Sequence, residues 1–308
     1  AANTAVPLAN LDETQLRRTI EFLQENQVSI DIFAAGPARS SGDNSEVVTG
    51  GRGDTPQLAT TFAAGEEAAM AVGRGGAGRR ELSPVWAPLD RAGVALTRGQ
   101  ETRIDLVVRT RNVGHFFPGG TVDAYDVWLE LKATDENGLT VFWSGVVEDG
   151  GSGPVDGGAH FYASRLVDGH GNPIDKRNAF AARTAAWINL IPPGAADVAH
   201  FRLAIPEDCG DELTLEARLN YRKFTHFNTH FSFSGTPAPG EPAAAGPGID
   251  RVTRDYDDRD FVFGSVPHDV SAQVREVPDL PIVVMAVDTL QLRVVDAGVP
   301  AADASPPD

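Results

Sequence analysis

Residues 102–145 constrain the fold more than any other part of the chain, because they hold three strand-like runs in close order. Apolar and polar side chains alternate in the first two runs, which predicts strands with one buried face. The third run follows the turn Asp135-Glu136-Asn137-Gly138, and Asn-Gly between such runs is a strong hairpin signal. The apolar members of the three runs are Ile104, Leu106, Val108, Val127, Leu129, Leu131, Val141 and Trp143.

Further short runs extend this pattern over most of the chain. With 32 Gly and 21 Pro among 308 residues, about a sixth of the chain favours turns, against a usual share of roughly 12%. A helical stripe is clear only at residues 11–25, and the last two predicted strands are joined tightly at Asp288 and Thr289. About ten short strands predict an all-β protein, a β-sandwich with a short N-terminal helix and long loops. The further strands are expected at residues 28–32, 94–96, 161–167, 185–190, 199–205, 213–219, 221–233, 282–287 and 290–295.

Four parts follow from this organisation. Residues 1–35 hold the N-terminal helix and a strand, and residues 36–87, rich in Gly, Ser, Ala and Arg, form an insertion or long surface loop. Residues 88–235 form the sandwich core, and residues 236–308 a Pro/Gly-rich linker with C-terminal strands. The sequence opens without an initiator Met or a signal peptide, so we expect a cut precursor or part of a longer polypeptide. The chain has no apolar run of about 18 residues, so no membrane span is expected.

Charge and cysteine content exclude several classes of function. A net charge of −17 argues against nucleic acid or an anionic membrane surface as partner. The single cysteine, Cys209, excludes an internal disulfide, a Cys-rich metal site and a Cys-x-x-Cys-His motif for covalent haem attachment. Its acidic neighbours should hold its pKa up, which does not suit a nucleophile. Since no Gly-x-Ser-x-Gly, His-Glu-x-x-His or Walker motif occurs either, we do not expect an enzyme.

The loop Gly-His-Phe-Phe-Pro-Gly-Gly at residues 114–120 is the first candidate site. In one interpretation it contacts a flat aromatic or porphyrin ligand, with His115 as an axial nitrogen and Phe116 and Phe117 packed beside it. In the other it is a bulged β-connection whose aromatic side chains plug one end of the sandwich. The Pro-Gly-Gly sequence that follows is typical of turns and favours the second interpretation. Both interpretations stay open.

His226 and His230, four residues apart, are the second candidate. On a helix this spacing would let both imidazoles reach one zinc ion. The run around them has β-like alternation, and on a strand they would lie about 13 Å apart, at roughly 3.3 Å per residue. Bonds of about 2 Å cannot span that distance, so the strand interpretation predicts no shared zinc. Each histidine would then serve a separate ligand or simply lie on an exposed polar face.

Acidic residues gather in loops at residues 135–137, 168–175 and 255–260. Calcium takes six to eight oxygen ligands, which clustered carboxylates can supply. None of the three loops matches the EF-hand spacing. We expect acidic surface loops, and calcium binding is the alternative.

Three stretches resemble a known family: NVGHFFPGGTVDAYDVWLELKATDENG at residues 112–138, GAHFYASRLV onward at residues 158–208, and LTLEARLNYRKF at residues 213–224. They are similar to the C-terminal β-rich region of bacterial multihaem c-type cytochromes. The opening residues 2–7 and 15–34 resemble the segment that follows the last haem-binding motif in those proteins. The resemblance implies a periplasmic or cell-surface location, a role in electron transfer and haem carried on Cys-x-x-Cys-His motifs. This chain departs from the family in having no such motif.

From the resemblance we expect a non-catalytic extracytoplasmic β-domain that packs on, and organises or shields, a multihaem electron-transfer cytochrome. It would carry no covalent cofactor but would contact c-type haem held by a partner polypeptide or an upstream segment, in a larger assembly. The expected haem-facing residues are His115, Phe116, Phe117, His226 and His230. The alternative is a cell-surface adhesion or carbohydrate-binding β-sandwich, with or without calcium.

Overall fold

The computed structural model describes residues 2–38, 47–48, 85–174, 179–233, 273 and 277–298. Most of the predicted insertion at residues 36–87 lies outside the described residues. The same is true of the linker at residues 236–248 and the acidic run at residues 255–260. The sandwich itself is described almost completely.

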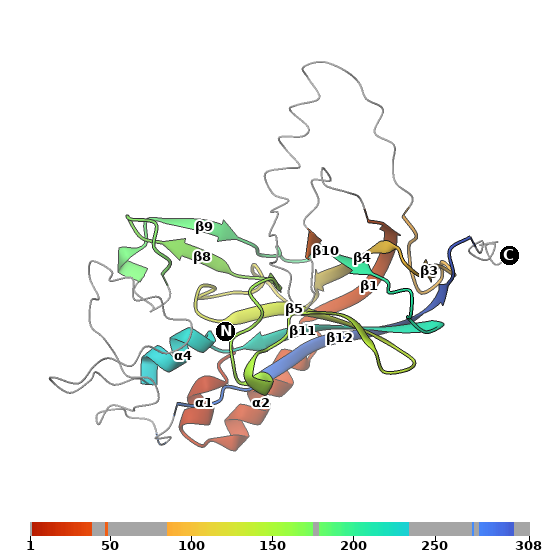
Figure 1. The fold of residues 1–308 in the computed structure, drawn as a ribbon. Helices are drawn as coiled ribbons and strands as arrows, with labels where there is room; N and C mark the ends of the chain where they lie inside the picture. Colours follow the sequence, from red (N-terminus) through yellow and green to blue (C-terminus); the bar gives the residue numbers. More distant parts are fainter. Residues whose placement is uncertain are drawn as a thin grey trace, which may run out of the picture.

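Two sheets make up the sandwich (Figure 1). Within the first sheet β1, β4 and β10 are antiparallel, and β2 adds a short parallel edge. Its strands, in spatial order, are β1 (Val28–Pro37), β4 (Glu101–Thr110), β10 (Ala196–Ala204) and β2 (Val47–Val48). In the second sheet the order is β3 (Ala95–Thr97), β12 (Ile282–Val295), β11 (Glu212–Arg222), β5 (Asp126–Asp135) and β6 (Thr140–Ser144), with β7 (His160–Phe161) also paired to β5.

One hydrophobic core lies between the two sheets. Ile104, Leu106 and Val108 of β4 are fully buried, as are Leu129 and Leu131 of β5, so the alternation correctly predicted the inner faces. Burial of each such side chain stabilises the fold by about 1.5–3 kcal/mol. The all-β sandwich fold is therefore confirmed. Strands β1 and β12 of the sandwich lie outside residues 88–235, so residues 1–35 and 236–308 both contribute to the fold.

The expected hairpin is present, because β5 and β6 are antiparallel neighbours and Gly138 takes the positive φ of 84° that the turn requires. The strand predicted at residues 161–167 is divided into β7 and β8 (Ser164–Val167). β8 pairs with β9 (Thr184–Ile188) in a separate two-stranded sheet, which Figure 1 shows beside the sandwich.

Helix α2 (Glu13–Gln24) packs against strand β12 of the second sheet. It is the helix predicted at residues 11–25, and its N-cap Asp12 accepts a hydrogen bond from the Gln15 N–H at 2.9 Å. Leu23 carries its apolar face into the core. None of the helices in the described parts of the chain is long and apolar enough to cross a membrane. The other helical elements are α1 (Ala5–Ala9), α4 (His226–Phe233) and the 3₁₀ turns η1 (Asp149–Gly151) and η2 (Ala179–Ala181).

The prediction of two C-terminal strands is wrong, since β12 runs unbroken for 14 residues. The expected turn at Asp288 and Thr289 lies inside the strand, where Asp288 is paired with Ala217 of β11. The Asp288 carboxylate accepts a hydrogen bond from the Ile32 N–H at 2.8 Å. A contact with the facing sheet therefore takes the place of the local turn that an aspartate favours.

The strand predicted at residues 221–233 is also wrong. β11 ends at Arg222, and Phe224 takes a left-handed φ of 67° that turns the chain. The Thr225 hydroxyl then accepts a hydrogen bond from the Asn228 N–H at 3.1 Å, which caps the start of α4. His226 and His230 are therefore helical residues.

Candidate functional site

The His-Phe-Phe-Pro loop carries the chain from β4 in the first sheet to β5 in the second. Its middle is anchored to the loop that precedes β10: the Phe117 N–H donates to the Ile191 carbonyl at 2.8 Å, and the Ile191 N–H donates back at 2.7 Å. The Phe117 ring is 5% exposed and lies 6.2 Å, between ring centres, from Tyr162. Phe117 therefore plugs the end of the core, as one of the two interpretations of this loop predicts.

His115 and Phe116 lie outside the core, and the Phe116 side chain is 56% exposed. His115 Nδ1 lies 2.7 Å from the Phe116 carbonyl oxygen. Because a carbonyl can only accept, Nδ1 carries a proton, and in the neutral imidazole the lone pair then lies on Nε2. Gly119 lies under the imidazole, where a Cβ atom would overlap the ring. The loop thus buries one aromatic side chain and presents a histidine and a second aromatic outward.

An apolar cavity of about 180 Å³ adjoins His115. Tyr125 and Tyr221 meet in its wall with ring centres 5.7 Å apart, and the Tyr221 hydroxyl donates to the Ala2 carbonyl at 2.6 Å. Burial raises the pKa of Tyr125 to about 12 and also raises that of Tyr221, so both phenols are neutral at neutral pH. The rest of the wall includes Phe22, Leu23, Phe117, Pro118 and Met285.

His226 and His230 lie on one face of α4, with ring centres 4.1 Å apart. The sequence argument against a shared metal is therefore wrong in its premise, because it placed them on a strand. The sequence does contain a signal for this helix. Thr225 is a capping residue, and the histidines and phenylalanines that follow it repeat every four residues. Burial, with smaller effects of His230 and Arg222, lowers the pKa of His226 to about 4. Burial also lowers the pKa of His230.

The five predicted haem-facing residues do not share one cavity. His115 and Phe117 line the apolar cavity, and Phe116 lies beside them in the same loop. His226 and His230 line a second cavity of about 360 Å³, whose wall includes Asp149, Arg222 and Asp279. Among the described residues, no three His, Cys, Asp or Glu side chains are grouped closely enough to hold a metal ion as they stand.

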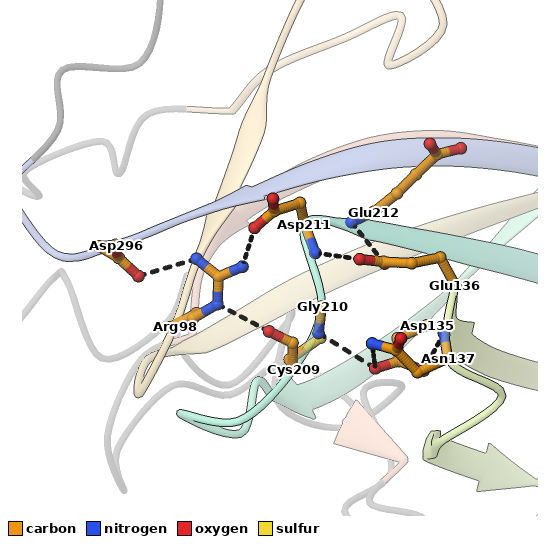
Figure 2. Close-up of polar contacts among 9 residues, drawn as sticks. All are labelled: Arg98, Asp135, Glu136, Asn137, Cys209, Gly210, Asp211, Glu212 and Asp296. Carbon is orange, nitrogen blue, oxygen red and sulfur yellow. Dashed lines mark hydrogen bonds and ion pairs between the residues drawn. The ribbon is translucent and has the colours of Figure 1, made fainter.

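The acidic loop at residues 135–137 is a structural joint between β5 and β11 (Figure 2). Asp135 accepts hydrogen bonds from the N–H groups of Leu139 at 2.7 Å and Gly210 at 3.0 Å. Glu136 accepts from the N–H groups of Asp211 at 2.6 Å and Glu212 at 2.8 Å. Desolvation would raise the pKa of Asp135, but hydrogen bonds from Gly210, Leu139 and Asn137 lower it below its usual value. In this structure the two carboxylates act as hydrogen-bond acceptors that join the β5–β6 turn to the start of β11.

Arg98 completes this joint, because its guanidinium donates to the Cys209 carbonyl at 2.7 Å and pairs with Asp211 and with Asp296 at 2.8 Å (Figure 2). Burial, with a smaller effect of Asp135, raises the pKa of the Cys209 thiol, which agrees with the expectation that it is no nucleophile. The Asp168 carboxylate, like that of Asp135, accepts hydrogen bonds from backbone N–H groups, here those of His170 and Asn172 in its own loop.

No protein family model and no curated protein matches the chain. Two solved structures are similar to parts of it. A penta-haem cytochrome c552 from Thermochromatium tepidum is 17% identical over 41% of this chain and 29% of its own, with a TM-score of 0.29. A family 123 glycoside hydrolase from Clostridium perfringens is 11% identical over 40% of this chain and 19% of its own, with a TM-score of 0.19. This chain thus spans less than a third of either protein, and similarities this weak say nothing of its function.

Proposed function

We propose that this chain is a non-catalytic extracytoplasmic β-domain that packs on a multihaem c-type cytochrome and covers the edge of one of its haems. The observation that carries the proposal is the exposed His115 beside an apolar cavity, with its Nδ1 held by a backbone carbonyl so that Nε2 is the nitrogen available to a ligand. A histidine nitrogen is an axial ligand of haem iron, and aromatic side chains pack well against a flat ring.

The residues present fit a haem that another segment carries. One cysteine cannot form the two thioether bonds of a c-type haem. The cavity of about 180 Å³ is smaller than the roughly 300–1,000 Å³ of pockets that enclose small ligands, so it would receive only an edge. Ala2 lines the same cavity, so any segment joined ahead of it would leave the fold beside His115.

A bound haem would supply one-electron transfer. The chain's own contribution would be a nitrogen ligand from His115 and an apolar cover from Phe116, Phe22 and Met285. Excluding water from a haem edge changes its reduction potential. Gly119 permits this position of the imidazole, because a Cβ atom there would overlap the ring.

A c-type haem peptide with its own histidine on one side and an open axial position on the other tests the ligand directly. Adding the chain should shift the Soret band and convert the iron from high to low spin. His115→Ala should abolish the shift, while His170→Ala, a change in an exposed turn, and the double variant His226→Gln/His230→Gln should retain it. No shift with the wild-type chain, or a shift that survives His115→Ala, would overturn the role of His115.

The assembly itself is tested on natively isolated material. Its visible spectrum should be that of a c-type cytochrome, and a haem stain after denaturing electrophoresis should label a haem-bearing segment other than residues 1–308. A preparation that contains this chain and no haem would contradict the proposal.

One observation favours the alternative of carbohydrate binding. Trp143 is 40% exposed on β6, its Nε1 donates to Glu130 at 2.9 Å, and the Lys132 ammonium lies 4.4 Å from the ring centre. An exposed indole flanked by polar groups can stack on a sugar ring. If this is the function, glycan binding should be lost in Trp143→Ala. Binding that persists in that variant, or no binding to any glycan, would exclude this site.

A further inference from the structure

We propose that His226 and His230 form a two-imidazole binding site for a first-row transition-metal ion at the second cavity. Both side chains project from α4 at positions i and i+4, which lie on the same face one turn apart. This is the spacing through which helices present two histidines to one zinc ion. The site does not depend on a haem partner, since neither histidine lines the cavity beside His115.

The separation of the two rings fits a shared ion. Two nitrogens bound to a tetrahedral metal at about 2.0–2.1 Å lie about 3.3–3.4 Å apart. The ring centres are 4.1 Å apart, so side-chain rotations that separate the rings and turn one nitrogen of each toward the same point would place both nitrogens on one ion. Helix α4 fixes the two Cα positions through its backbone hydrogen bonds, so binding would order few additional bonds.

The cavity offers further ligands and a suitable charge. Asp149 and Asp279 lie in its wall and can supply carboxylate oxygens, and its volume of about 360 Å³ leaves room for water. Arg222 also lines the cavity, but its guanidinium donates to Asp126 at 2.9 Å and to the Gly153 carbonyl at 2.6 Å. Asp126 thus offsets part of the positive charge of Arg222, and the two wall carboxylates favour a cation.

The donor set selects the class of metal. Imidazole nitrogen with carboxylate oxygen suits zinc, copper, nickel and cobalt, whereas calcium and magnesium require mainly oxygen ligands. Copper should bind most tightly and cobalt less tightly than nickel, following the general order of divalent ions. Millimolar calcium or magnesium should not compete.

Equilibrium dialysis of the chelator-treated chain against Ni²⁺ and Zn²⁺ tests the site, with the visible spectrum of bound Co²⁺ reporting its ligands. We expect one ion per chain. His226→Gln and His230→Gln should each lower the association constant at least about tenfold. His170→Gln and His115→Ala should leave it unchanged, so this site and the haem contact can fail separately. No stoichiometric binding by the wild-type chain, or wild-type affinity in either glutamine variant, would overturn the proposal.

A measurement on the unaltered chain removes any dependence on how the variants fold. Diethyl pyrocarbonate modifies accessible imidazoles, and mass spectrometry of the peptides measures each histidine. Zn²⁺ should protect His226 and His230 together and leave His170 reactive. Equal modification of His226 and His230 with and without Zn²⁺ would show that the ion binds elsewhere or not at all.

Discussion

Replacing Arg222 by methionine should destabilise the fold more than most single changes, because it leaves a buried charge without its partner. Asp126 of β5 and Arg222 of β11 face each other in paired strands and are 6% and 3% exposed. The guanidinium donates to Asp126 Oδ2 through Nη2 at 2.9 Å and Nε at 3.3 Å, and through Nη1 to the Gly153 carbonyl at 2.6 Å. Methionine keeps much of the side-chain stem but makes none of these hydrogen bonds.

The magnitude follows from the cost of an isolated buried charge. Breaking a buried ion pair by removing one partner costs about 3–5 kcal/mol. Each 1.4 kcal/mol is about a factor of ten, so the unfolding equilibrium constant should rise by about two to three and a half orders of magnitude. Removing both charges, in Asp126→Leu/Arg222→Met, should recover most of the loss, because desolvation of the pair offsets most of its attraction.

Urea denaturation followed by tryptophan fluorescence measures these free energies of unfolding. The matched control is Glu21→Gln, which breaks an exposed helical pair with Arg17, 3.9 Å apart, and should cost at most about 0.5 kcal/mol. If Arg222→Met cost no more than Glu21→Gln, or if the double variant were less stable than the single one, the electrostatic explanation would be refuted.

The pH dependence gives an independent check. Burial raises the pKa of the Asp126 carboxyl, and the Arg222 guanidinium opposes that rise, so losing Arg222 raises the pKa further. A carboxyl whose pKa is raised by folding destabilises the fold as pH rises from its unfolded pKa through its folded pKa. The free energy of unfolding that Arg222→Met loses relative to the wild type should therefore become smaller when the pH is lowered from about 8 to about 5.

Three further outcomes are expected. Gly119→Ala should displace the His115 ring and weaken the Soret response to the haem peptide, while changing the urea midpoint little. Cys209, buried and with a raised pKa, should react with iodoacetamide in the native chain far more slowly than in the urea-unfolded chain, as mass spectrometry would show. Hydrogen bonds from the N–H groups of Glu212 and Asp211 lower the pKa of Glu136, so its contribution to stability should be present above about pH 4.3 and lost as the pH falls through the folded pKa. Thermal unfolding across that range should show a smaller loss in Glu136→Gln.

The inner faces of the sandwich were readable from the sequence because burial on one side of a strand imposes a period of two. Ile104, Leu106 and Val108 follow this rule. Trp128 does not, since alternation places it on the outer face, yet it is fully buried beside Val155. The chain that follows β6 covers that face, and no pattern within β5 could reveal it.

The candidate site was only partly readable, because its arrangement depends on contacts between distant segments. The loop around His115 was identified by its aromatic content, but whether each ring faces in or out depends on its pairing with Ile191. The helix that holds His226 and His230 was missed because the alternating pattern of β11 was extended past Arg222. The Thr225 cap and the left-handed Phe224 end that pattern within two residues.

Arg222 connects the buried ion pair with the histidine cavity, and this gives a prediction in which stability and binding change in opposite directions. Its guanidinium lines the cavity and, in spite of Asp126, places a positive charge near a bound cation. Arg222→Met removes that charge, so Ni²⁺ affinity should rise even as the free energy of unfolding falls. Dialysis well below the urea midpoint measures the first and denaturation the second. A general loosening of α4 would lower both, so a fall in Ni²⁺ affinity would show that Arg222 acts there by holding the helix in place and not through its charge.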